Sequence, residues 1–533
     1  MTTTMRTTRV VALALAAAAG YTAACTDPTV SPRSTVSSAN IFNDTASYRA
    51  YIAKIYAGLT VTGQTGPYGN GDIQGIDEGF SQYIRLLWQM EELPTDEAAL
   101  TYGDAGTQEL NTQLWGSTNQ FLVSMYYRIF FQATLANDFL RQTSDATLAS
   151  RGVTGTLATS IKQYRAEARF LRALSYAHGI DLFGNIPLVD ENSPIGSTAP
   201  QQSTRAQVYA YVVSELTAIR PSLPAPNLSD GTQYGRATQG AVDMLLAKLY
   251  LNAAVYTGTA DYANAAAAAQ RVIASGAYTL DPNYRHLFQA DNNTSPEMIF
   301  AIPQDGVHTQ SYGGTQFLIH AAVGGSMDPK AYGIDGGYYG LRIRPEVLAL
   351  YPGTTLSADK RAAFFYFKGQ SPTMASLTDF SQGIAAPKYT NVTSKGAAGS
   401  NATFPDTDYP MFRFGEAYLI YAEAVLRGGG GSRAQALAYV NALRDRAYGD
   451  TSGEITDAQL TLDFLLAERS RELLWEGDRR TDLVRYGLFS DKGVWTFKGG
   501  VQAGTTTPSF RNLYPLPASE LTTNPNLKQN PGY

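Results

Sequence analysis

The residues best suited to acid–base chemistry are Glu468, Glu472 and Glu476, which recur every four positions. That spacing would place all three carboxylates on one face of a helix. Glycoside hydrolysis needs two carboxyl groups that flank one bond from opposite sides, and a single helical face provides this badly. We therefore predict that the charged segment 468–485 supports the fold and that the chain is not an enzyme.

Basic residues in this segment stand where they could neutralise the carboxylates, because helical neighbours three or four positions apart can form ion pairs. The predicted pairs are Glu468 with Arg471, Glu472 with Arg469, and Glu476 with Arg480. We expect Glu476 and Arg480 to stabilise the fold without contacting a ligand.

The histidines and the single cysteine do not form a metal-binding pattern. The residues concerned are His178, His286, His308, His320 and Cys25. A structural zinc site needs four such ligands at close spacing. The sequence also lacks the G-x-S-x-G nucleophile motif and a phosphate-binding loop. We therefore expect no metal and no cofactor.

Several aromatic residues could instead bind sugars, whose apolar C–H faces stack on flat rings. Tyr312, Tyr338 and Tyr339 lie in a glycine-rich stretch, and Tyr83 and Trp88 lie close to Glu91 and Glu92. Large aromatic residues are most often buried, so a place in the core is the alternative for each ring. The three loop tyrosines are the preferred candidates because long loops frequently carry function.

The N-terminus has the pattern of an export signal. Two arginines precede a short apolar run, and small residues follow directly before Cys25, the only cysteine. This arrangement resembles a bacterial lipoprotein signal, in which that cysteine is acylated, although Thr22 departs from the usual aliphatic residue. We predict a signal peptide over 1–24, lipidation at Cys25 and a flexible tether over 25–38. A simple signal peptide with an incidental cysteine is the alternative.

Composition excludes one class of partner. The 533 residues carry a formal net charge of −5, with 44% hydrophobic and 16% charged residues. A nucleic-acid-binding protein needs a basic surface, so we expect no nucleic-acid partner. No segment after the signal looks apolar enough to span a bilayer, so lipid would be the only membrane attachment.

Apolar residues at helical spacing predict a mostly helical chain. The predicted helices are 47–58, 112–142, 158–182, 205–219, 239–254, 262–274, 412–426, 432–447 and 462–486. The predicted strands or extended pieces are 298–302 and 513–516.

Two of the predicted helix pairs resemble each other. Ala247 and Leu251 match Ala422 and Leu426, and the alanine-rich helices that follow also match. Small residues at these spacings let antiparallel helices approach closely, as in tetratricopeptide repeats. Between the pairs lies a loop-rich insertion at about 283–408, too aromatic to be disordered. The sequence therefore predicts an all-α, tetratricopeptide-like scaffold with a long insertion, folded as one domain over 39–533.

Several longer stretches resemble the SusD/RagB family of outer-membrane nutrient-binding lipoproteins. They are 166–173 (AEARFLRA) with 182–188 (LFGNIPL), 411–424 (MFRFGEAYLIYAEA), 441–447 (NALRDRA) with 468–485 (ERSRELLWEGDRRTDLVR), and 524–533 (NPNLKQNPGY). These motifs occur in the family's order, whereas the insertion carries no recognisable motif.

The resemblance implies a surface-exposed, lipid-anchored protein of the outer membrane. It also implies a partner, a TonB-dependent outer-membrane transporter of the SusC type, and an oligosaccharide ligand, with a peptide as the alternative. We therefore expect a protein that captures a nutrient oligomer and passes it to the transporter. A surface glycoside hydrolase and a repeat scaffold that binds only proteins are the alternatives.

Overall fold

The computed structural model describes residues 42, 44–196 and 199–533. The predicted signal peptide, Cys25 and the tether lie outside these residues. Residues from Arg49 to Tyr533 form one compact unit, and the contacts discussed below lie within it. None of the helices in the described ranges combines enough length and apolar character to cross a bilayer.

Helices dominate the structure, which confirms the predicted fold class. The long helices are α3 (Thr45–Ala57), α6 (Gln120–Gln142), α8 (Gly155–Phe183), α9 (Arg205–Ile219), α10 (Gln239–Leu251), α12 (Tyr262–Ala274), α16 (Phe414–Leu426), α17 (Arg433–Tyr448) and α18 (Leu462–Leu473). The shorter helices are α4 (Tyr83–Glu92), α5 (Ala105–Thr112), α7 (Asp145–Ser150), α11 (Ala253–Thr257), α13 (Gly314–Ala322), α14 (Pro345–Ala349), α15 (Thr355–Ala358), α19 (Arg479–Arg485) and α20 (Ala518–Thr523).

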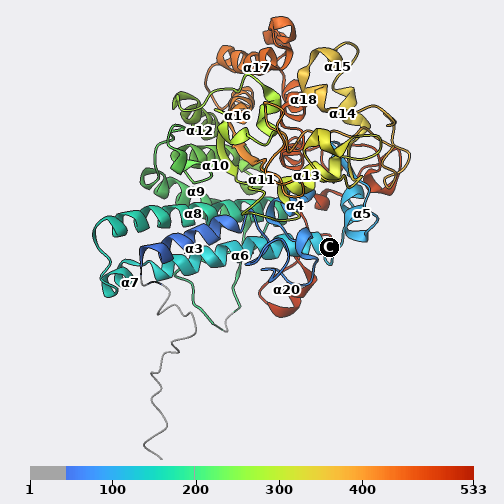
Figure 1. Ribbon diagram of the computed structural model, residues 1–533. Coiled ribbons are helices and arrows are strands. Elements are labelled where there is room, and N and C mark those ends of the chain that lie inside the picture. Colours follow the sequence, from blue (N-terminus) through green and yellow to red (C-terminus); the bar gives the residue numbers. More distant parts are fainter. Residues whose placement is uncertain (1–41, 43, 197–198) are drawn as a thin grey trace, which may run out of the picture. The chain divides into compact units, whose positions relative to one another are not determined.

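The predicted helix pairs stack as a scaffold. Helices α8, α9, α10, α12, α16 and α17 pack in succession, each against the next (Figure 1). Helix α12 packs against both α10 and α16, and its Ala265, Ala268 and Ala269 are fully buried. Ala422 of α16 is also fully buried. Because these side chains are small, the helix backbones can approach closely.

The short strands form three pairs, two of which join segments that are distant in the chain. They pair antiparallel as β1 (Ala98–Leu100) with β5 (Leu341–Ile343), β2 (Ile186–Pro187) with β3 (Gln202–Ser203), and β4 (Met298–Ile302) with β6 (Tyr409–Arg413). The strand predicted at 298–302 is confirmed. The segment predicted at 513–516 as a strand or extended piece pairs with no strand. Leu513 has an extended backbone, and Tyr514 donates its backbone N–H to the carbonyl of Leu182.

Three predicted helices are shortened or broken in the structure. The helix predicted at 239–254 ends at Leu251, and Ala253 begins the short helix α11. The helix predicted at 112–142 begins only at Gln120, because Gln113 adopts a left-handed backbone (φ 59°) and Asn119 caps the new helix. The helix predicted at 462–486 breaks into α18 and α19. At the break Trp475 adopts φ 62°, and its carbonyl accepts a hydrogen bond from Trp88 Nε1 at 3.0 Å.

The charged segment 468–485 is buried, and its carboxylates pair mainly with residues far away in sequence. Glu468 contacts Arg361, Arg444 and Arg471, each at 2.8 Å, so the predicted pair with Arg471 is confirmed. Glu472 instead contacts Arg413 at 2.7 Å, Arg361 at 3.1 Å and Arg446.

The other two predicted pairs are therefore wrong. Arg469 pairs with Asp482 at 2.6 Å, on α19, rather than with Glu472. Glu476 lies in the break between the helices, where it contacts Lys388 and Arg413. Helical spacing no longer applies there, and Arg480 pairs with Asp181 at 2.7 Å.

Glu91 and Glu97, which contact basic residues of this segment, each have fewer basic side chains within ion-pairing distance than Glu468 and Glu472. Burial raises the pKa of Glu91 to about 8, although Arg480 lies 3.3 Å away and lowers it. Burial likewise raises the pKa of Glu97 to about 7 despite the nearby Arg479. The folded protein therefore holds protons on these groups at pH values where an unfolded chain would release them.

We predict that Glu91→Gln gains stability relative to the parent as the pH rises. The raised pKa of Glu91 contributes stability that is fully present below its unfolded pKa of about 4.5 and is lost as the pH rises through about 8. Each pKa unit corresponds to about 1.4 kcal/mol, so the difference should reach a few kcal/mol at most. Urea unfolding of both proteins at pH values near 5 and 8.5 measures it. A difference that does not change between these two pH values would contradict the assignment.

Candidate functional site

The loops of the 283–408 segment meet the chain after β1 at one surface. In the β1–β5 ladder Leu100 lies opposite Leu341, and Thr101 continues it by donating its N–H to the carbonyl of Gly340 at 3.1 Å. The Thr101 hydroxyl also donates to the carbonyl of Tyr339, at 2.7 Å. The two-stranded ladder therefore fixes the segment that carries Tyr338 and Tyr339.

Helix α13 holds the other side of this segment. Tyr338 and Tyr339 donate their backbone N–H groups to the carbonyls of His320 and Val323, at 2.7 and 3.1 Å. A Cβ atom at Gly337 would lie 2.2 Å from the carbonyl oxygen of Val323, so only glycine permits this approach. The glycine-rich sequence thus serves close packing as well as loop formation.

Three tyrosine rings lie close together at this surface, and with the ring of Tyr339, the next residue in the chain after Tyr338, they make up what we call the tyrosine platform. The three are Tyr68, Tyr312 and Tyr338. Tyr68 is 63% exposed, and its ring centroid lies 5.0 Å from that of Tyr312 with the planes tilted by 31°. Tyr338 and Tyr339 are 38% and 53% exposed. Such flat, half-exposed rings are suited to stacking on an apolar ligand face.

Buried neighbours hold these rings in place. Tyr312 packs edge-on against Phe404 at 5.1 Å, and Tyr339 packs edge-on against Phe380 at 5.6 Å. The ring of Tyr338 stacks on the buried ring of His320 at 4.8 Å. Ordered rings lose little conformational entropy when a ligand binds, so the tyrosine platform is preorganised.

Polar groups lie at the edges of the tyrosine platform. Burial raises the pKa of the Tyr338 hydroxyl, to which Gln316 Nε2 donates a hydrogen bond at 2.8 Å. Burial also raises the pKa of Tyr312. Both hydroxyls are therefore neutral near pH 7 and can donate or accept. The carboxylate of Asp335, about half exposed, adds an acceptor for ligand hydroxyls.

Two sequence-predicted site residues are not on this surface. Tyr83 and Trp88 lie on α4 with no exposed area. The Tyr83 hydroxyl bonds Nδ1 of His178 at 2.8 Å, and the Trp88 ring packs between Phe317 and Trp475. Both side chains belong to the core, where a ligand at the surface cannot contact them.

Two residues near this surface were missed by sequence reasoning. Tyr68 lies in the stretch from Gly63 to Gly75, which is as glycine-rich as the stretch around Tyr338, and this signal could have identified it. Tyr102 is mostly covered, and burial raises its pKa to about 12. Its place near Tyr338 depends on the β1–β5 pairing, which no local pattern reveals.

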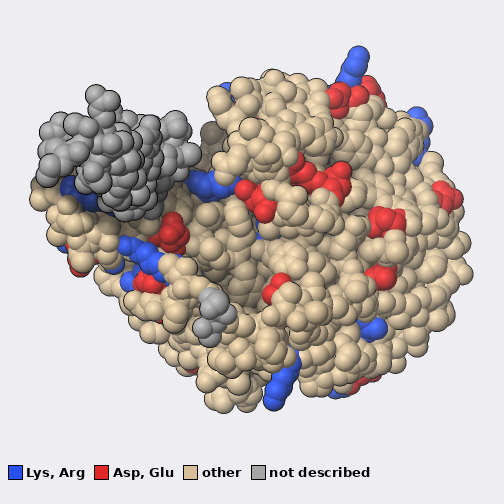
Figure 2. Space-filling model, turned by 90° about the horizontal axis from the view of Figure 1, so that it is seen from below, with Lys and Arg blue, Asp and Glu red and all other residues tan. Residues whose placement is uncertain are grey.

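The structure offers little for acid–base or metal chemistry. Glu468 and Glu472 have no exposed area, so a substrate cannot reach them in this structure. Within the described ranges, no group of three or more His, Cys, Asp or Glu side chains could hold a metal ion. Figure 2 shows a face on which uncharged residues cover most of the surface and charged side chains lie in small groups.

Comparison with known proteins identifies the family. Residues 260–533 match the model of the SusD family. The chain is 35% identical to the starch-binding protein SusD of Bacteroides thetaiotaomicron over 528 residues, which cover 90% of this chain and 91% of that protein.

Solved structures share the fold. A SusD superfamily protein from B. thetaiotaomicron superposes with a TM-score of 0.71 at 20% identity, covering 91% of this chain and 99% of that one. A surface glycan-binding protein A from the same organism, in complex with laminarihexaose, gives a TM-score of 0.68 at 21% identity, covering 91% and 98% of the two chains. Together with the sequence matches, this shows that the chain belongs to the SusD family.

Proposed function

We propose that this chain is a cell-surface lipoprotein that binds an oligosaccharide and delivers it to a TonB-dependent outer-membrane transporter. The tyrosine platform carries the proposal, because its rings are exposed, fixed in orientation and bordered by neutral hydroxyls and a carboxylate. This combination suits a neutral, hydroxyl-rich ligand with apolar faces. Binding without chemistry fits the burial of Glu468 and Glu472.

The relatives support a glycan over a peptide. The relative at 35% identity is named for starch binding, and a protein of the same fold was solved with laminarihexaose. Membership of the family supports the proposed transporter partner and the proposed outer-membrane location.

A binding and product assay tests the function. We expect the purified protein to bind at least one of starch, laminarin and related glucans in affinity electrophoresis and calorimetry. The bound glycan should be recovered at its original chain length, because Glu468 and Glu472, the carboxyl groups best spaced for acid–base chemistry, are fully buried. Shortened products would show a glycoside hydrolase. Binding of peptides but of no glycan would overturn the ligand class.

Lipid anchoring is tested separately, at Cys25. We predict that Cys25→Ala protein fails to incorporate a fatty-acid probe and leaves the membrane fraction. A single acyl chain anchors only marginally, so stable attachment implies more than one chain at this residue. Cys25→Ala protein that still carries the label and partitions wholly with membranes would place the anchor elsewhere.

A further inference from the structure

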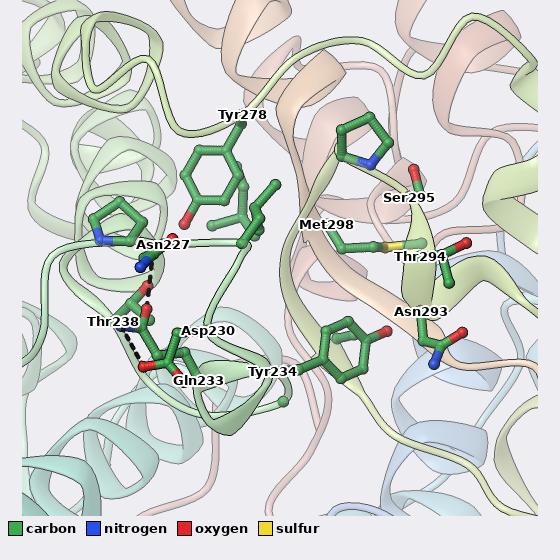
Figure 3. A pocket seen from close by; sticks show the side chains of 16 residues that line it. Asn227, Asp230, Gln233, Tyr234, Thr238, Tyr278, Asn293, Thr294, Ser295 and Met298 are labelled. Carbon is green, nitrogen blue, oxygen red and sulfur yellow. Dashed lines mark hydrogen bonds between the residues drawn. The ribbon is translucent and has the colours of Figure 1, made fainter.

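A second hollow lies apart from the tyrosine platform, between the loop before α10 and the segment before β4. Figure 3 shows the rings of Tyr234 and Tyr278 with the side chains of Asn227 and Asn293 around it. Its volume is about 200 Å³. Pockets that enclose whole small molecules usually span about 300–1,000 Å³, so this hollow suits one unit of a longer ligand.

The lining of this hollow combines apolar surface with unused polar groups. Met298, Ile299 and the partly exposed Leu228 supply apolar surface, and the two tyrosines supply rings. The side-chain amide of Asn293 is exposed and makes no hydrogen bond to the described residues. A side-chain amide can both donate and accept hydrogen bonds, and so can each hydroxyl of a sugar, so the two groups can pair in either direction.

The walls of the hollow are held rigidly. The Tyr234 hydroxyl donates to the buried carboxyl of Asp408. Gln233 Oε1 accepts the backbone N–H of Asn227 at 3.0 Å, and Asp230 accepts that of Thr232 at 3.0 Å. The loop is therefore shaped before any ligand arrives, which reduces the entropy cost of binding.

Further hollows form a path from this site toward the tyrosine platform, each sharing lining residues with the next. A hollow of about 550 Å³ shares Tyr234 and Asn293 with the hollow around Tyr234 and Tyr278. A smaller hollow of about 240 Å³ shares Val307 and His308 with the 550 Å³ hollow. The smaller hollow is also lined by Gly66 and Gln310. Tyr68 and Tyr312 follow these two residues by two positions each, so the path ends at the tyrosine platform.

We infer that the hollow around Tyr234, Tyr278 and Asn293 is a second sugar-binding site, which holds a distant unit or branch of the oligosaccharide captured by the tyrosine platform. This inference rests on the proposed function and specifies its ligand as a long chain. A short oligosaccharide occupies the tyrosine platform alone. A long one occupies both sites, and the second contact forms at the high effective concentration that the first provides.

The test compares ligand lengths in an Asn293→Leu variant, which removes the free amide but keeps its size. The probes are maltose and maltoheptaose, with laminaribiose and laminarihexaose as a second series. We expect the Kd of the long members to rise about threefold to tenfold, and that of the short members to change less than about twofold. Leu228→Ala, on the opposite loop, should show the same dependence on length.

Asn264→Leu is the matched control, because Asn264 is an exposed asparagine on α12 that lines none of the three hollows. It should bind both lengths as the parent does. If Asn293→Leu and Leu228→Ala also bind both lengths as the parent does, the second site is wrong while the proposed function stands. Equal weakening of short and long ligands would likewise overturn it. A parent that binds neither these series nor any other glycan overturns both proposals.

Discussion

Replacing Tyr312, Tyr338 and Tyr339 together by alanine should weaken glycan binding by about tenfold or more. Truncating a ring that stacks on a ligand costs roughly 1–4 kcal/mol, and each 1.4 kcal/mol corresponds to a factor of ten in Kd. Tyr338 and Tyr339 are exposed, and Tyr312 is only partly buried, so the scaffold should tolerate the change. Calorimetry with the glucan that binds the parent measures the loss, and far-UV circular dichroism should show unchanged helix content.

Tyr439→Ala is a suitable control for this triple variant. Tyr439 is a partly buried tyrosine on α17, where its ring stacks on Tyr418 at 4.3 Å, away from the loops of the tyrosine platform. It should bind the glucan as the parent does. If the triple variant also binds as the parent does, the rings do not carry the affinity. The hollow around Tyr234 and Tyr278 would then be the next site to examine.

Local signals predicted the scaffold well where a helix depends on its own sequence. The bounds of α9 and α12 agree with the prediction, and at α9 the reason is visible, since Thr204 and Gln207 form a capping box at its start. The break between α18 and α19 was missed because Trp475 is held in its left-handed conformation by tertiary contacts, among them the hydrogen bond from Trp88. Helical spacing contains no information about such contacts.

The ion pairs and the candidate site show the same limit. Sequence spacing offered Arg469 as the partner of Glu472, but the partners in the structure include Arg361, 111 positions away. Likewise Thr101 and Tyr339, 238 positions apart, are joined by a hydrogen bond that shapes the tyrosine platform. Glycine-rich sequence indicated which tyrosines lie in surface loops. It could not show that Tyr83 and Trp88 lie on a helix that is buried on every side.

Arg413→Met should destabilise the protein by about 3–5 kcal/mol. The Arg413 side chain is 1% exposed and contacts Glu297 at 2.8 Å, Glu472 at 2.7 Å and Glu476 at 2.5 Å. A buried charge left without its partner costs about this much, because the low-dielectric interior cannot replace the lost solvation. Thermal and urea unfolding measure the loss. The fraction that remains folded should bind glycan with the parent's affinity, because Arg413 lies in the core, at the end of β6.

Arg433→Met provides the comparison, because Arg433 forms an ion pair of similar length, 2.7 Å, with Asp457 at the surface. Exposed pairs usually contribute no more than about 1 kcal/mol, since water screens both charges before and after folding. A similar loss in both variants would show that burial does not govern the cluster. Unchanged stability in Arg413→Met would mean that Arg361, Arg446 and Lys388 suffice to neutralise the three carboxylates. Weakened glycan binding at an unchanged melting temperature would instead assign the cluster a role in recognition.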